Sequence, residues 1–106
     1  MAATGWTFLT NHAQVFLCIA QNTHLTARDI AVQVEITERA VQRILADLGK
    51  EGYIRHVREG RTNRYTIDLD KPLRHPAQRG QRVRDLLSQL LHEMSEISSD
   101  NQRSSI

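Results

Sequence analysis

The apolar residues at the start of the chain recur at the spacing of two helices separated by a short polar loop. Residues 11–21 contain neither glycine nor proline, and Asn11 with Gln14 three positions later resembles a capping box, so a largely buried first helix is expected. After the loop, Thr26 is a good N-cap for a short second helix, and Asp29 complements the N-terminus of that helix. Its expected inward residues are Ile30, Ala31 and Val34.

A third helix is expected over residues 38–51, because only a tight turn at Glu35 and Ile36 precedes the next N-cap, Thr37. Gly52 follows as a C-terminal glycine should. Apolar residues at i, i+3, i+4 and i+7 predict a buried stripe of Val41, Ile44, Leu45 and Leu48. At roughly 100° per residue, the opposite face is a basic ridge. It carries Arg39, Arg43 and Lys50, with Gln42 and Ala46 beside them.

Two later runs, residues 53–58 and 64–67, are rich in β-branched and aromatic residues and flank a polar Glu-Gly-Arg-Thr-Asn sequence. This pattern predicts a hairpin with Gly60 or Asn63 in the left-handed turn position. The expected inward residues of the hairpin are Ile54, Tyr65 and Ile67. Residues 68–76 contain two prolines, which predicts an extended connector.

A last amphipathic helix is expected from about residue 78 to residue 97. Its apolar residues follow the 4, 3, 4, 3 spacing of a coiled-coil seam, which Leu86 and Leu91 widen. A helix of this length, joined through a proline-containing connector, favours pairing with a second copy, although the seam could instead fold back on its own core. The expected homodimer interface consists of Val83, Leu86, Leu87, Leu90, Leu91, Met94 and Ile97. The serine-rich tail, residues 98–106, predicts disorder.

The charge of the chain is small on average and concentrated locally. The 106 residues suit one compact domain with one appended element. They include 14 basic and 12 acidic residues, a net charge of +2, and 12 of the basic residues are arginines. Arginine presents a planar fork of donors that matches phosphates and guanine edges. Residues 37–65 carry a local charge of +3 and the first 36 residues carry −1, so the positive charge gathers on the third helix and the hairpin.

Other residue types exclude several classes of protein. Cys18 is the single cysteine, so we expect no intrachain disulfide, a cytoplasmic setting, and a buried thiol rather than a redox switch. The longest apolar run, residues 15–20, is far shorter than the ~20 residues of a membrane span, and no signal peptide is evident. The five histidines lack the spacing of metal ligands, and no catalytic set or glycine-rich phosphate loop is present. We therefore expect neither an enzyme nor a cofactor.

The order of helix, short helix, tight turn, helix and hairpin is that of a winged helix-turn-helix. The stretches at residues 25–31, 36–48, 51–54 and 58–65 carry this order within residues 6–76. There the sequence resembles small winged-helix transcriptional regulators of the MarR-like and ArsR-like superfamily. The expected fold is mainly α with a small β-hairpin wing (α+β). The expected organisation is a DNA-binding domain at 1–76, a C-terminal dimerisation helix at 77–97 and a disordered tail at 98–106.

The resemblance implies a sequence-specific regulator, expected to be a repressor, that binds double-stranded DNA as a homodimer on an inverted-repeat operator. The helix at 38–51 would enter the major groove, and the wing at 59–64 would reach the minor groove or the backbone. Arginines can read guanine and Gln42 can read adenine, while the free amides after Thr37 suit a phosphate. The expected DNA-binding residues are Thr37, Glu38, Arg39, Gln42, Arg43, Lys50, Arg58, Arg61, Thr62, Asn63 and Arg64.

Three alternatives stay open at the level of sequence. The basic ridge could be an ordinary solvated face in which Arg39 pairs with Glu35, or Arg43 with Asp47, at i, i+4. The basic face could bind an acidic protein partner instead of specific DNA. The family often has glycine in the turn before the third helix, so Glu35 is expected either to weaken binding near the phosphates or to reshape the turn.

Overall fold

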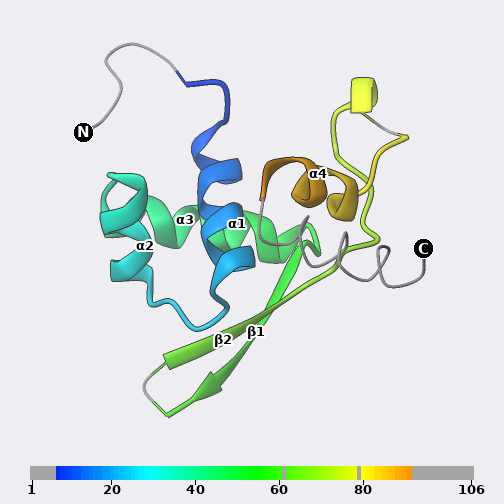
Figure 1. Cartoon of the computed structure of the whole chain (residues 1–106). Coiled ribbons are helices and arrows are strands. Elements are labelled where there is room, and N and C mark those ends of the chain that lie inside the picture. The colour runs from blue at the N-terminus through cyan, green and yellow to red at the C-terminus, as the bar shows by residue number, and fades with distance from the viewer. Residues whose placement is uncertain (1–6, 61, 79, 92–106) are drawn as a thin grey trace, which may run out of the picture. The chain divides into compact units, whose positions relative to one another are not determined.

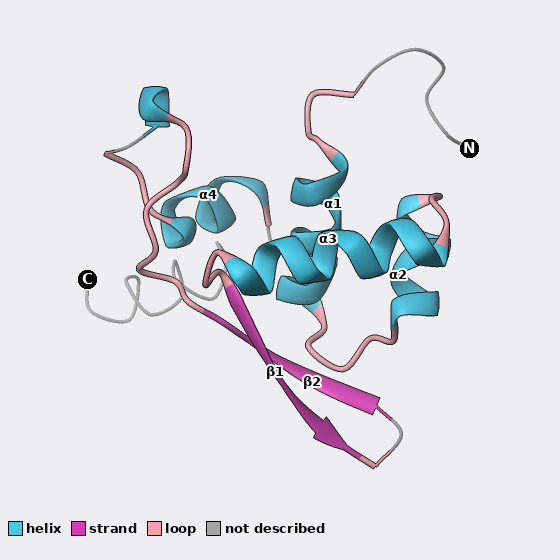
Figure 2. Cartoon of the chain, turned by 180° about the vertical axis from the view of Figure 1, so that it is seen from behind, coloured by secondary structure: helices cyan, strands magenta, loops and turns pink. Residues whose placement is uncertain are grey.

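The computed structural model describes residues 7–60, 62–78 and 80–91. The chain divides into two compact units, Met1–Ile67 and Asp68–Ile106. The first contains the helices α1 (Asn11–Gln21), α2 (Ala27–Val34) and α3 (Glu38–Lys50), followed by the strands β1 (Ile54–Glu59) and β2 (Thr62–Ile67) (Figure 1). The three helices pack on one another, and the hairpin starts at the end of α3 and runs obliquely back beside them, with its turn end projecting away from the helices (Figure 2).

Each of the three helices begins at a threonine whose hydroxyl accepts a hydrogen bond from a free backbone amide. Thr37 accepts from the amide of Ala40 at 3.0 Å, and Thr26 caps α2, both as predicted. Asp29 also accepts from the amide of Thr26, which makes a full capping box that was not predicted from the sequence. The expected cap of α1 at Asn11 was wrong. Thr10 lies one residue earlier in an extended conformation and accepts from the amide of Ala13 at 3.1 Å, so Asn11 is already the first helical residue.

The turn between α2 and α3 depends on the backbone of Glu35. This residue has φ 65° and ψ 45°, the left-handed conformation that glycine adopts most easily. Its amide donates to the carbonyl of Ala31 at 2.8 Å, and the amide of Ile36 donates to the same carbonyl at 3.2 Å. Glu35 therefore closes the turn in a conformation that glycine adopts without strain, and as a non-glycine residue it does so at the cost of backbone strain.

The core of the first unit lies where the apolar faces of the three helices meet. Ile30 and Ala31 of α2 and Val41 and Ile44 of α3 are buried, as the helical pattern predicts. The other predicted inward residues, Val34, Leu45 and Leu48, are half-buried. The ring of Phe16 in α1 meets Tyr53, just before β1, edge to face with centroids 6.4 Å apart. Burial of each large apolar side chain stabilises the fold by about 1.5–3 kcal/mol. The buried side chains of Val41 and Ile44 therefore hold α3 firmly against the other two helices.

The hairpin is antiparallel, with Ile54 opposite Ile67 and Glu59 opposite Thr62. Gly60 takes the left-handed turn position with φ 62°, which decides between the two expected candidates. Ile54 and Tyr65 are buried and Ile67 is half-buried. The amide of Tyr65 also donates to the carbonyl of Thr23 at 3.0 Å. This bond ties β2 to the loop between α1 and α2.

In the second unit, the expected continuous helix from residue 78 was wrong at its start. Pro76–Gln78 form a short 3-10 helix, and α4 spans only Val83–Leu90. The backbone between them pairs with the connector instead, because the amide of Leu73 donates to Gln81 and the amide of Val83 donates to Lys71. Gly80 in this stretch also disfavours helix.

The burial along α4 differs from the expected seam. Leu91 has an extended backbone that caps the helix, so the expected run of helix through this residue was also wrong. Val83, Leu87 and Leu91 are buried within the single chain, Leu86 is half-buried, and Leu90 is 42% exposed. Met94, Ile97 and the tail at 98–106 lie outside the described residues.

The first prediction concerns the strained turn. We expect Glu35→Gly to stabilise the fold by about 0.5–1 kcal/mol, because relief of about 1–2 kcal/mol of left-handed strain exceeds the added entropy of the unfolded chain. Glu35→Gln keeps the strain but removes the charge and serves as the control. Glu35→Val should destabilise, since a β-branched residue is least tolerated at positive φ. Urea denaturation checks all three, and equal stabilities for Gly and Gln would contradict the assignment.

The second prediction concerns pH. Hydrogen bonds from Thr26, first from its backbone amide and then from its hydroxyl, hold the pKa of Asp29 below its ordinary value of 3.8. A carboxyl group whose pKa falls on folding adds stability above its unfolded pKa, and this is lost as the pH falls through the folded value. Asp29→Ala should therefore lower Tm at neutral pH and lower it less below about pH 3.8, which melting curves by circular dichroism would show. A decrease in the Tm of Asp29→Ala that is equally large at every pH would contradict this role of the Asp29 charge.

Candidate nucleic-acid interface

The outer face of α3 is a polar surface that packing in the core directs toward solvent. Val41 and Ile44 are buried against the other helices, so the residues on the far side of α3 are left exposed. This face consists of the exposed residues Glu38, Arg39, Gln42, Arg43, Ala46 and Lys50. The predicted basic ridge is therefore present, although Thr37 at its start uses its hydroxyl to cap the helix.

The arginines of this ridge are not taken up by pairs within the helix. Neither an Arg39–Glu35 pair nor an Arg43–Asp47 pair forms among residues 7–60, 62–78 and 80–91. The carboxylate of Asp47 lies instead 2.8 Å from Nε2 of His12, at the start of α1. Neither guanidinium group has an ion-pair partner in this part of the chain, so the two intrahelical pairings named in the first alternative do not form there.

The register of the hairpin separates its arginines onto two faces. Directly opposed residues share a face and successive residues alternate, so a spacing of three reverses the side each time. Arg58 lies on the same face as Ile54, His56 and Tyr65, opposite Asn63. Arg55 and Arg64 belong to the other face. The run of arginines in the sequence is therefore not one ridge in the wing.

Arg64 is further distinguished by an acidic neighbour. Its Nε lies 2.9 Å from Oε2 of Glu59, and Nε2 of His24 lies 4.0 Å from the other carboxylate oxygen. On the opposite face of the hairpin, the Nε of Arg58 donates to the carbonyl of Gly60 at 3.4 Å. Arg61 and the side chain of Thr62, both expected at the wing, lie outside the described part of the chain.

A groove of about 340 Å³ separates α3 from the face of the hairpin that carries Arg58. Leu45, Ile54 and Tyr65 supply its apolar lining. Four polar side chains capable of donating hydrogen bonds also line it, and these are Gln42, Lys50, His56 and Asn63. Its lining contains no acidic residue, so it suits a negatively charged group such as a phosphate.

Sequence reasoning missed His56 in this groove. The signal was its position two residues after Ile54, which places both on one face of the strand, and its place directly opposite the buried Tyr65. The rings of His56 and Tyr65 lie 6.0 Å apart between centroids.

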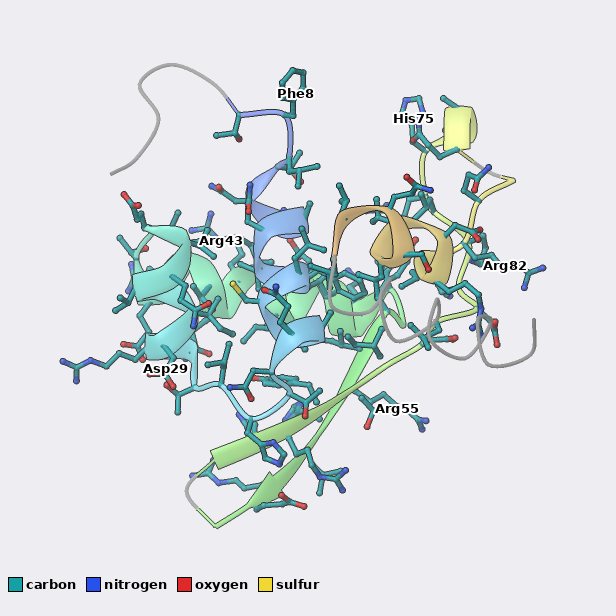
Figure 3. The ribbon with its side chains drawn as sticks, viewed as in Figure 1. Phe8, Asp29, Arg43, Arg55, His75 and Arg82 are labelled. Atoms are coloured by element: carbon teal, nitrogen blue, oxygen red, sulfur yellow. The ribbon has the colours of Figure 1, made fainter. Side chains whose placement is uncertain are left out.

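Figure 3 labels Arg43 and Arg55, with the side chain of Arg55 extending from the hairpin.

Other candidate chemistries find little support in the described part of the chain. Burial raises the pKa of the Cys18 thiol, and its Sγ donates to Oε1 of Gln33 at 3.5 Å, which disfavours the reactive thiolate. No cluster of His, Cys, Asp or Glu in this part could hold a metal ion. None of its helices is long and apolar enough to cross a membrane.

Comparison with known proteins places the fold in a family. The family model "Sugar-specific transcriptional regulator TrmB" matches residues 8–68, which include all three helices and the hairpin. The chain belongs to the TrmB family. This TrmB-family protein is therefore a winged helix-turn-helix transcriptional regulator that binds DNA and is not an enzyme, as predicted. Membership also favours DNA over the alternative of an acidic protein partner.

Solved structures of two bacterial proteins resemble the TrmB-family chain more distantly. MepR, described as a transcription regulator of the Staphylococcus aureus multidrug efflux pump MepA, is 19% identical with a TM-score of 0.46, over 90% of this chain and 74% of MepR. A mutant of Lactococcus lactis ZitR is 16% identical with a TM-score of 0.46, over 97% of this chain and 77% of ZitR. No curated protein matches the chain significantly.

The third prediction concerns the pair of Arg64 and Glu59. We expect Glu59→Gln to raise DNA affinity, because it removes a negative charge and frees Arg64 for a phosphate. The slope of log affinity against log salt should steepen by about 0.9 if one phosphate contact is gained. Fluorescence anisotropy with duplex DNA at several salt concentrations measures both.

The matched control introduces Glu59→Gln into an Arg64→Ala background, where the gain in slope should disappear. An unchanged slope in the otherwise native chain would mean that Arg64 stays away from the phosphates.

Proposed function

We propose that this TrmB-family regulator recognises a specific sequence in double-stranded DNA through α3 and represses transcription by occluding a promoter. The observation that carries the proposal is the outer face of α3. Arg39, Gln42 and Arg43 are exposed there, and neither arginine has an ion-pair partner among the described residues. Among the described residues, no ion pair occupies the guanidinium groups of Arg39 and Arg43.

In the proposed complex, the N-terminal half of α3 enters the major groove. Arg39 and Arg43 lie one helical turn apart and can each donate two hydrogen bonds to O6 and N7 of guanine. Gln42, beside them, can form the matching pair of bonds with adenine. Each good contact of this kind discriminates against the wrong base by about 1–3 kcal/mol. Sequence preference would therefore come from these three residues.

The DNA backbone would be held by the groove beside α3 and by the start of the helix. Lys50 and Asn63 line the groove and can donate to a phosphate, as can His56 and, on the same face of the hairpin, Arg58. At the other end of α3, the free amides that follow Thr37, including that of Glu38, suit a second phosphate. Arg61 and Thr62 complete the proposed contact surface, and Arg64 would join it only when Glu59 releases its guanidinium group. They fix the register of the protein and carry no sequence information directly.

We further propose a homodimer formed through residues 77–97, with residues 1–76 as the DNA-binding part. Leu90, 42% exposed, and Leu86, half-buried, are the apolar side chains of α4 that the chain leaves accessible. Met94 and Ile97 continue this series in the sequence. The proposed interface therefore centres on these four residues. The originally expected seam also included Val83, Leu87 and Leu91, whose burial within the chain makes them supports of α4 rather than contacts.

A two-fold dimer would place two copies of α3 against half-sites about one helical turn, roughly 34 Å, apart. The matching operator is an inverted repeat, because the symmetry of the protein is mirrored in the DNA. Occupation of such a site within a promoter would exclude the polymerase, which is the proposed basis of repression.

The fourth prediction tests the division of roles. On a duplex selected from a random pool, Arg39→Ala and Arg43→Ala should each weaken binding and reduce discrimination by about 1–3 kcal/mol at one position. Lys50→Ala should weaken all sequences alike and lower the salt slope by about 0.9. Arg55→Ala, on the hairpin face away from the groove, is the matched control and should change sequence preference little. Unaltered sequence preference in both α3 variants would refute recognition by this face.

The fifth prediction tests assembly. The native chain should sediment as a dimer at micromolar concentration, and Leu90→Asp should sediment as a monomer, because a charge at the interface loses its solvation. Val32→Asp is the matched control, since Val32 on α2 is 71% exposed and lies outside the proposed interface. A native monomer, or a Leu90→Asp dimer, would contradict the proposed interface.

A further inference from the structure

We propose that His12 is a positioning residue for DNA binding, which keeps Arg43 free by holding the carboxylate of Asp47. The proposal rests on the proposed function, in which Arg43 contacts DNA. Its basis is a contact between residues 35 positions apart, in which Nε2 of His12 lies 2.8 Å from Oδ2 of Asp47. His12 is the second residue of α1, whereas Asp47 lies in the second half of α3. The hydrogen bond therefore links α1 to α3, the proposed recognition helix.

Asp47 is the nearest acidic competitor for Arg43 along α3. It follows Arg43 by four residues, and side chains at this spacing lie on the same face of a helix at about 5–6 Å between Cβ atoms. Both side chains are exposed, so no packing separates them. An unrestrained Asp47 carboxylate could therefore reach the guanidinium group of Arg43, and DNA would have to displace it.

The hydrogen bond to His12 directs that carboxylate toward α1 instead. Arg43 has no ion-pair partner among residues 7–60, 62–78 and 80–91, which is the result expected if Asp47 is occupied. An arginine that precedes an aspartate by four residues is also the less favourable order for a helical ion pair. A partner from another helix can therefore compete for the carboxylate successfully.

The position of His12 is itself fixed by the core. The Thr10 cap sets the start of α1 two residues earlier, and the buried side chains of Val15 and Ile19 hold α1 where it packs against α3. The imidazole therefore meets Asp47 without a rearrangement of either helix. A glutamine at this position carries a donor nitrogen at a comparable distance from the backbone and should preserve the interaction.

The experiment measures duplex affinity by anisotropy at low salt, where ion pairs are least screened. His12→Ala should weaken binding about twofold, as expected for the gain of a helical ion pair that DNA must break. His12→Gln should bind like the native chain. Adding Asp47→Asn to His12→Ala should restore native affinity, because the competing charge is gone. A merely structural role of the hydrogen bond predicts no rescue by Asp47→Asn.

A final comparison separates the inference from the proposed function on which it rests. Arg43→Ala alone must weaken binding, and an unchanged affinity would mean that the role of Arg43 itself is wrong. If Arg43→Ala does weaken binding, His12→Ala should have no further effect in that background. An equal loss in both backgrounds, or a native affinity for His12→Ala, would overturn the inference. Melting curves of each variant confirm that all are folded at the assay temperature.

Discussion

The burial of one face of α3 is the constraint on which the rest of the surface depends. Val41 and Ile44 are removed from water where α3 meets α1 and α2, and apolar burial of this size holds the orientation of the helix against rotation. A helix has a fixed angular relation between its faces, so burial of one stripe determines which residues point outward. Arg39, Gln42 and Arg43 are exposed for that reason, and the proposed recognition surface follows from the core.

A second constraint acts through the backbone of the turn and the hairpin. Glu35 adopts a left-handed conformation that lets α3 follow α2 at once, and a strained residue of this kind persists only where the surrounding contacts outweigh its cost. In the hairpin, the antiparallel register decides which side chains line the groove beside α3. Because this register alternates, His56 lies on the same face as Arg58, whereas Arg64 lies on the other.

The local ion pairs of the protein determine its surface more than its net charge does. The net charge of +2 conceals two different surfaces. The outer face of α3 forms no ion pair with the residues that the structure describes, whereas in the wing Arg64 lies 2.9 Å from Glu59. Exposed pairs of this kind stabilise a fold by at most about 1 kcal/mol, so their larger consequence is the choice of which cations stay available. For a DNA-binding regulator, that choice decides where counterions are released and hence where affinity arises.

The sequence by itself determined the three helices, the hairpin, the buried stripe of α3 and the threonine caps of α2 and α3. These features depend on periodicity and on neighbours within about four residues, which a sequence displays directly. Only the tertiary structure decided that Asp47 bonds to His12 rather than Arg43, that His56 lines the groove, and that α4 begins at Val83. Each of these outcomes depends on a contact between residues far apart in the chain or on a strand register. Local periodicity cannot encode such a contact, because the geometry that creates it exists only after the core has packed.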